Sequence, residues 1–206
     1  MIPYHAAAII AILTAYLMGS ISTAIIVCWL MRLPDPRSVG SHNPGTTNVL
    51  RIGGKQAAFL TLCGDMLKGF LPVLIAKWYP FTPFILSIIA LSAFLGHLFP
   101  VFFRFRGGKG VATLLGCLFA LNIPLGLAAA LTWIITIALF RYSSLSSLVT
   151  ATLAPFYAWY FADNAYIVAI ALMSLLLIYR HQPNIRNLLT GKENRVGETQ
   201  SSHPNG

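Results

Sequence analysis

The sequence predicts an all-α, polytopic integral membrane protein. Apolar residues make up 57% of the 206-residue chain, charged residues make up only 9%, and the mean hydropathy is +0.73. A typical soluble domain carries about 25% charged residues. Because a helix needs about 20 apolar residues to cross a bilayer, the chain has room for roughly seven spans with short loops. We expect residues 1–206 to form a single membrane domain, with a loose cytoplasmic tail over about 196–206.

Seven apolar stretches account for the expected spans. The first is not a secretory signal peptide, because no basic residue precedes it and its apolar run is too long. The fourth is short, because Asn122 and Pro124 interrupt it. The expected helices cover 6–31, 56–78, 82–103, 108–121, 124–140, 147–162 and 164–180.

Basic residues lie almost entirely on one side of these spans. Of the 14 Lys and Arg residues, all but Lys68 and Lys77 fall in the loops and the C-terminal segment of that side. Cytoplasmic loops carry an excess of Lys and Arg. We therefore expect the N-terminus outside and the C-terminus in the cytoplasm. The same bias explains the net charge of +9, so no nucleic-acid partner is expected.

Three dense polar segments interrupt the apolar sequence: GSHNPGTTNVLR at 40–51, FRGGKGVAT at 105–113 and HQPNIRNLLTGKEN at 181–194. All three fall on the expected cytoplasmic face. Placing charged groups in or near a bilayer is costly, so such clusters usually mark a functional site. Cations, glycine backbone and small hydroxyl groups together suit an anionic, phosphate-bearing substrate.

The first polar segment combines flexible backbone with hydrogen-bonding side chains. Gly40 and Gly45 permit tight turns. Asn43 and Thr47 supply short polar groups, and Arg51 offers a planar fork suited to phosphate. The alternative is an ordinary polar loop that follows the positive-inside rule.

The second polar segment indicates an anion-binding site more specifically than the first. Gly107, Gly108 and Gly110 surround Lys109 just where a helix is expected to begin. The free amides and dipole of a helix start attract an anion, and the lysine would add a full charge. The segment is not a P-loop, because Gly110 stands where Ser or Thr should follow the lysine. A flexible turn between spans is the alternative.

The third polar segment begins where the last span ends. His181, Asn184 and Leu188 have the spacing of one face of a continuing helix, and Glu193 follows after Gly191. A single histidine at a membrane interface is more often structural than catalytic. Both interpretations of His181 therefore stay open on spacing alone.

Further polar side chains fall in or beside the spans. Asp65 and Lys68 are three residues apart and share a helix face, where they either pair or contact the substrate. His97 either bonds a neighbouring helix or joins the same cavity. In RYSSLSS at 141–147, Ser144 and Ser147 either cap a helix or donate to phosphate.

Several common catalytic patterns are missing from the sequence. The five acidic residues form no close pair for Mg²⁺, and no His/Cys cluster suggests zinc. The three cysteines have no CxxC spacing and are expected as small buried apolar residues. No His-x4-Asp signature and no GxSxG elbow occur. We expect no metal and no cofactor, and catalysis by positioning and electrostatic stabilisation.

These segments resemble the PlsY family of bacterial acyl-phosphate:glycerol-3-phosphate acyltransferases. That family is marked by a GSxNxGxTN-like stretch ending in Arg, a GGKGVAT stretch and an H-x2-N…G-x-E stretch, and all three occur here in order. GDMLKG at 64–69 and GHLFP at 96–100 are also similar. The resemblance extends to about Arg195. His42 departs from the pattern, where members often have Gly, as does Thr46, where Ala is common.

The resemblance implies a reaction and a location. An acyl group would pass from acyl phosphate to the 1-hydroxyl of sn-glycerol 3-phosphate, giving lysophosphatidic acid and inorganic phosphate in phospholipid biosynthesis. The partners would be these two substrates and the lipid bilayer. The protein would lie in the bacterial cytoplasmic (inner) membrane, with its active site on the cytoplasmic side.

The resemblance also suggests roles for individual residues. Lys109 and the amides of Gly107 and Gly108 would bind the leaving phosphate of the donor. Arg51, Ser41 and Asn184 would bind glycerol 3-phosphate. His181 would bind phosphate or accept the hydroxyl proton, with a donor phosphate oxygen as the alternative base. The expected catalytic residues are Lys109, His181 and Arg51, and the expected substrate contacts are Ser41, Asn43, Thr47, Arg51, Gly107, Gly108, Lys109, Gly110, Ser144, Ser147, His181, Asn184 and Glu193.

Other function classes fit less well. A transporter of phosphorylated metabolites needs polar groups near mid-membrane and access from both sides, but the outer half offers only Lys77 and Asp163 near its edge. A CDP-alcohol phosphotransferase needs clustered Asp residues for metal, which are absent. A lipid-binding scaffold would not need three separate motifs.

Overall fold

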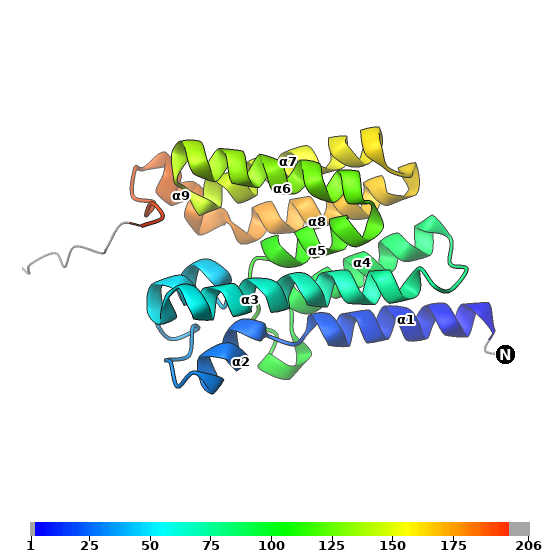
Figure 1. The fold of residues 1–206 in the computed structure, drawn as a ribbon, viewed down its shortest axis with the longest axis horizontal. Helices are drawn as coiled ribbons and strands as arrows, with labels where there is room; N and C mark the ends of the chain where they lie inside the picture. Colours follow the sequence, from blue (N-terminus) through cyan, green and yellow to red (C-terminus); the bar gives the residue numbers. More distant parts are fainter. Residues whose placement is uncertain (1–2, 198–206) are drawn as a thin grey trace, which may run out of the picture.

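The computed structural model describes residues 3–197 and shows a bundle of helices (Figure 1). Within this range every regular element is helical, as predicted. Residues 1–2 and 198–206, which include most of the predicted tail, lie outside the described part. The elements are α1 (Tyr4–Gly19), α2 (Thr23–Leu30), α3 (Thr46–Ala76), α4 (Pro83–Leu98), η1 (Val101–Phe103), α5 (Val111–Leu121), α6 (Ile123–Phe140), α7 (Ser143–Phe161), η2 (Asn164–Tyr166), α8 (Ile167–Arg180) and α9 (Gln182–Leu189).

The helix expected over 6–31 is in fact two helices, α1 and α2, bent by 42°. Ser22 between them has an extended backbone. The break frees the carbonyl of Ile21, and Nζ of Lys68 donates a hydrogen bond of 2.8 Å to this oxygen. This hydrogen bond pairs a carbonyl that the break leaves without a helical partner, so Lys68 stabilises the break.

α3 is longer than the helix expected over 56–78, because it begins at Thr46 inside the first polar segment. Gly54 has a φ of 74° and kinks the helix at that point. Only glycine adopts such a backbone without strain. The turns before the kink carry Thr47 and Arg51, which precede the helix expected over 56–78.

The other helices lie within a few residues of their expected positions, with two exceptions. The stretch expected over 82–103 is α4 followed by the short 3₁₀ helix η1. After α8 the chain does not continue straight, because α9 turns away by 59° at His181.

The outer surface of the bundle is apolar. Trp29, Trp78, Trp159 and Tyr160 are all more than two-thirds exposed, as expected for a surface that faces lipid. Among the described residues, α3, the α4–η1 stretch and α6 are each long and apolar enough to cross a membrane, and the pairs α1–α2 and η2/α8–α9 raise the number to five. The seven spans and their orientation remain predictions.

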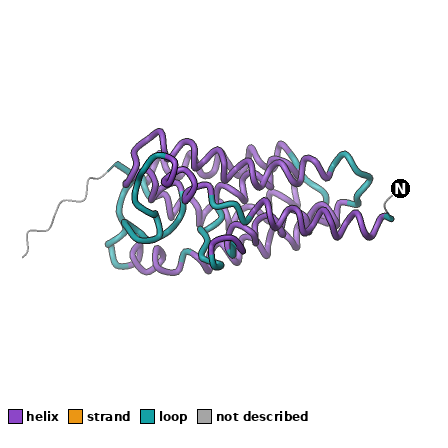
Figure 2. The backbone as a smooth tube through the Cα atoms, turned by 90° about the horizontal axis from the view of Figure 1, so that it is seen from below, coloured by secondary structure: helices purple, strands orange, loops and turns teal. Residues whose placement is uncertain are grey.

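Small residues bring α3 and α5 close together. A Cβ on Gly116 would collide with the carbonyl oxygen of Met66, and one on Gly69 would collide with that of Thr113. Cys117 is buried in the same contact, 3.5 Å from the carbonyl oxygen of Gly69. Glycines of this kind permit close packing between helices in membranes. This packing holds the start of α5 in place. The larger loops lie toward the end of the bundle away from the N-terminus (Figure 2).

Candidate active site

The three polar segments meet around one cavity of about 270 Å³. Its walls come from 40–51, from the starts of α5 and α7, and from the chain between α8 and residue 194. Asp65 of α3 and His97 of α4 also line it. Ten of the predicted contacts line the cavity: Ser41, Asn43, Thr47, Arg51, Lys109, Gly110, Ser144, His181, Asn184 and Glu193.

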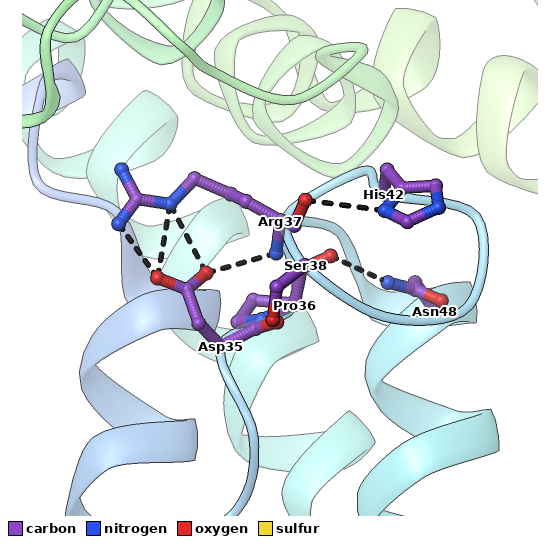
Figure 3. A network of polar contacts seen from close by, with 6 residues as sticks. All are labelled: Asp35, Pro36, Arg37, Ser38, His42 and Asn48. Atoms are coloured by element: carbon purple, nitrogen blue, oxygen red, sulfur yellow. Dashed lines mark hydrogen bonds and ion pairs between the residues drawn. The ribbon is translucent and has the colours of Figure 1, made fainter.

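Asn48 positions the first polar segment. Its Oδ1 accepts a hydrogen bond of 2.9 Å from the backbone N–H of Ser41. Its Nδ2 donates to the carbonyl oxygens of Pro36 at 2.8 Å and Val39 at 3.0 Å, and Figure 3 shows the first of these two bonds. Gly40 has a φ of 64°, and any Cβ there would collide with the Asn48 amide. The buried Asn48 side chain therefore directs Ser41 toward the cavity.

Lys109 lies where the glycine-rich segment enters α5. Gly110, which caps this helix with a φ of 91°, lines the cavity together with Val111 and Ala112 of the first turn. The first N–H groups of a helix have no partner within the helix and attract anions. The cavity thus combines the Lys109 ammonium group with a helix N-terminus.

Gly107 and Gly108 hold the loop instead of lining the cavity. The N–H of Gly108 donates to the carbonyl oxygen of His97 at 3.3 Å. Nη2 of Arg180 donates to the carbonyl oxygens of Gly107 and Gly108 at 2.8 and 3.2 Å. A Cβ on Gly107 would collide with the His97 carbonyl. Because the N–H of Gly108 already donates to His97, the geometry does not support the predicted contact between this amide and phosphate.

A hydrogen-bonded chain connects Lys109 to two other elements. Nζ of Lys109 donates to Oδ1 of Asn184. Nδ2 of Asn184 donates to Oε1 of Glu193 at 2.7 Å, and Oγ of Ser144 donates to the same oxygen at 2.6 Å. Glu193 therefore fixes the Asn184 amide with its oxygen toward Lys109. The loop before α5 is tied in this way to α9 and to the start of α7.

Positive charge dominates the electrostatics of the cavity. Burial lowers the pKa of Lys109, the carboxylate of Glu193 opposes this shift, and the positive charges of Arg180 and Arg51 add to it. Lys109, Arg51 and Arg180 therefore lie near Glu193, while the other carboxylate of the wall, Asp65, is paired with Lys68. An anionic ligand would relieve the mutual repulsion of Lys109, Arg51 and Arg180.

His181 is buried and lines the cavity. Its Nδ1 lies 2.8 Å from the carbonyl oxygen of Leu177. A carbonyl can only accept, so in the neutral ring Nδ1 carries the hydrogen and Nε2 carries the lone pair. His181 can therefore accept a proton or a hydrogen bond through Nε2.

Of the two alternatives for Asp65 and Lys68, the structure shows the ion pair. Nζ of Lys68 lies 2.8 Å from Oδ1 of Asp65, and both side chains are buried. Nδ1 of His97 lies 3.7 Å from the same carboxylate oxygen, beyond hydrogen-bonding distance. Because Asp65 and His97 both line the cavity, this buried ion pair forms part of its wall.

The structure also adds residues that sequence reasoning had not selected. Asn187 and Asn194 line the cavity, and Oγ of Ser143 lies 3.1 Å from Oγ1 of Thr47. Asn187 lies three residues after Asn184, a spacing that places both on one helix face. Ser147, by contrast, faces away: it donates to the carbonyl of Ser143 and accepts from the Trp133 indole. In residues 3–197, no three His, Cys, Asp or Glu side chains are grouped to hold a metal.

An apolar helical bundle with a cationic, glycine-framed cavity is the architecture of a membrane-embedded protein whose cavity suits anionic groups. Comparisons with known proteins give the family. Residues 9–191 match the family described as glycerol-3-phosphate acyltransferase. The chain is 56% identical to the glycerol-3-phosphate acyltransferase of Methylococcus capsulatus over 184 residues, which cover 89% of this chain and 93% of the relative. It is 51% identical to that of Vibrio campbellii over 94% of this chain and 95% of the relative.

Solved structures agree with this assignment. The chain matches the crystal structure of PlsY (YgiH), an integral membrane glycerol 3-phosphate acyltransferase, in its glycerol 3-phosphate form, with a TM-score of 0.87 and 39% identity. The match covers 93% of this chain and 96% of that one. The lysophosphatidic acid form of the same protein matches with a TM-score of 0.85 and 38% identity over the same shares of the two chains. The chain belongs to the glycerol-3-phosphate acyltransferase family.

Proposed function

We propose that this protein transfers an acyl group from acyl phosphate to the 1-hydroxyl of sn-glycerol 3-phosphate. The products are lysophosphatidic acid, a phospholipid precursor, and inorganic phosphate. The observation that carries the proposal is the cavity in which Lys109, Arg51 and the start of α5 converge. Solved relatives in glycerol 3-phosphate and lysophosphatidic acid forms support the acceptor and the product.

Two phosphate groups must be held together for this reaction. Lys109, with the first turn of α5 behind it, binds the phosphate of the donor and stabilises the charge that develops as it leaves. Arg51 binds the phosphate of the acceptor through its planar fork. It lies at the opposite end of the first polar segment from Ser41. Asn184 and Glu193 position the lysine, since they orient its ammonium group.

The chemistry needs no enzyme nucleophile. The 1-hydroxyl oxygen attacks the acyl carbonyl carbon, the bond from that carbon to the phosphate oxygen breaks, and phosphate leaves with the bonding electrons. The hydroxyl proton passes to Nε2 of His181 or to a phosphate oxygen of the donor. The lone pair on Nε2 makes His181 competent for the first route.

We further propose that the protein crosses the bacterial cytoplasmic membrane seven times, with the cavity open to the cytoplasm and the N-terminus outside. The bias of basic residues supports this orientation. Cysteines placed singly at Asn43, Arg106 and Asn187, in a background without the native cysteines, should resist an impermeant thiol reagent in intact cells. Labelling of any of the three from outside, beside a normally behaving outer-loop control, would disprove the orientation.

The activity itself is tested with purified protein, acyl phosphate and glycerol 3-phosphate. We expect lysophosphatidic acid and inorganic phosphate to appear in equal amounts. Phosphate release without lysophosphatidic acid would mean hydrolysis, and would contradict the proposed transfer.

A further inference from the structure

A second polar hollow, of about 540 Å³, lies between the loop after α2 and the segment around η1. We call it the basic groove; its lining residues are Asp35, Arg37, Ser38, Phe102, Phe103, Arg104 and Arg106. Both of its walls continue along the chain into the catalytic cavity: 35–38 leads to Ser41, and 102–106 leads to Lys109. The proposed reaction gives this groove no role.

The groove carries two positive charges that no residue in the described part of the chain compensates. Arg37 forms a bidentate pair with Asp35, with Nη2 to Oδ2 at 2.6 Å and Nε to Oδ1 at 3.0 Å. This pair holds the pKa of Asp35 below its ordinary value and is neutral overall. Within residues 3–197, the exposed side chains of Arg104 and Arg106 have no hydrogen bond or ion pair.

The segment that presents these arginines is held in a specific conformation. Arg104 and Phe105 both have left-handed backbone, with φ values of 55° and 58°. Two such non-glycine residues in succession are strained and persist only where other contacts hold them. The N–H of Phe105 donates to the carbonyl of Pro100 at 2.9 Å. The Tyr16 hydroxyl donates to the carbonyl of Phe99 at 2.7 Å, which ties the segment to α1.

Large apolar side chains surround the two arginines. Phe102 and Phe105 are 59% and 57% exposed, and Val101 is exposed beside them. Aromatic side chains next to arginines are typical of the boundary between lipid tails and headgroups. A free phosphate ion would gain nothing from these aromatic contacts, whereas a phospholipid would use both features.

We propose that the basic groove binds the phosphate headgroup of an anionic phospholipid such as phosphatidylglycerol. Arg104 and Arg106 donate to the headgroup, because their guanidinium forks match phosphate oxygens. The acyl chains lie against Phe102 and Phe105. This site is separate from the catalytic cavity and does not depend on the reaction proposed above.

Native mass spectrometry of the full-length protein in detergent, titrated with phosphatidylglycerol or phosphatidylcholine, tests this proposal. We expect the wild type to bind one phosphatidylglycerol in preference to phosphatidylcholine. The double variant Arg104→Gln/Arg106→Gln should bind it about 30-fold more weakly, since each basic residue near a lipid surface contributes about a factor of five. The matched control Arg186→Gln/Lys192→Gln also removes two exposed charges, and should bind like the wild type.

Further variants and competitors separate the alternatives. Arg104→Lys/Arg106→Lys keeps the charge without the forks and should show an intermediate affinity. Equal losses in the groove and control variants would reduce the site to general attraction by net charge and overturn the proposal. Displacement of the lipid by millimolar inorganic phosphate would make it a soluble-anion site, and preferential binding of lysophosphatidic acid would make it a product site. Either result would overturn the phospholipid assignment.

Discussion

Removing the Lys109 side chain tests the proposed role of this cavity in stabilising the leaving phosphate. The ammonium group of Lys109 donates to Asn184, whose amide is fixed by Glu193, so Lys109 is a preorganised donor. Loss of one such donor to developing negative charge costs about 2.7–4 kcal/mol, or about 10²- to 10³-fold in kcat. Arg51 and Arg180 stay near the site, so the KM for glycerol 3-phosphate should change far less. We expect Lys109→Ala to show this pattern when phosphate release from acyl phosphate is followed at saturating acceptor.

Two controls separate charge from structure in this experiment. Lys109→Gln can still donate to Asn184 but carries no charge, so its kcat should fall nearly as far as that of Lys109→Ala. Lys192→Ala removes an exposed lysine outside the cavity and should leave kcat unchanged. A kcat for folded Lys109→Ala within about threefold of the wild type would refute the assigned role of this lysine.

Three other substitutions test the remaining parts of the site. Arg51→Lys should lower kcat/KM for glycerol 3-phosphate by about 10- to 100-fold, because a point charge replaces a bidentate fork; near wild-type kinetics would disprove its contact with the acceptor. His181→Ala should lower kcat by about 10²-fold or more if Nε2 takes the hydroxyl proton, whereas an effect confined to KM would assign the proton to the donor phosphate. Asp65→Asn leaves Lys68 buried without a counter-ion and should destabilise the protein by about 3–5 kcal/mol, against about 1 kcal/mol or less for the partly exposed Asp35→Asn. Thermal unfolding in detergent measures this difference, and equal effects would contradict a structural role for the buried pair.

Composition and hydropathy were sufficient to predict the helical membrane class and most helix positions. They could not predict the break between α1 and α2, because its stability depends on Lys68, which is distant in sequence from Ile21. The early start of α3 was missed for a related reason. The first turns of α3 contain the polar residues and glycines that are typical of a loop. In the structure these turns are helical, and the helix changes direction at Gly54.

The candidate site was predictable as a set of residues but not as an arrangement. The structure brings the three polar segments together around one cavity, whereas the sequence had placed them only on one expected face of the membrane. Motif composition could not separate residues that line the cavity from those that support it. Gly108 and Ser147 belong to the same motifs, yet they donate hydrogen bonds to the carbonyl oxygens of His97 and Ser143 and do not line the cavity. Likewise, nothing in the spacing of Asn184 and Glu193 showed that they would orient Lys109.

The central claim is direct acyl transfer from acyl phosphate to glycerol 3-phosphate at this cavity. It is tested most directly by the rate of lysophosphatidic acid formation with acyl phosphate and with acyl-CoA, at equal concentration, after exhaustive chelation of the purified protein. Because acyl phosphate is already an activated anhydride and the cavity supplies cations for its phosphate, we expect full activity with acyl phosphate and little with acyl-CoA. Equal rates with the two donors, or activity that returns only when Mg²⁺ is added, would contradict this account.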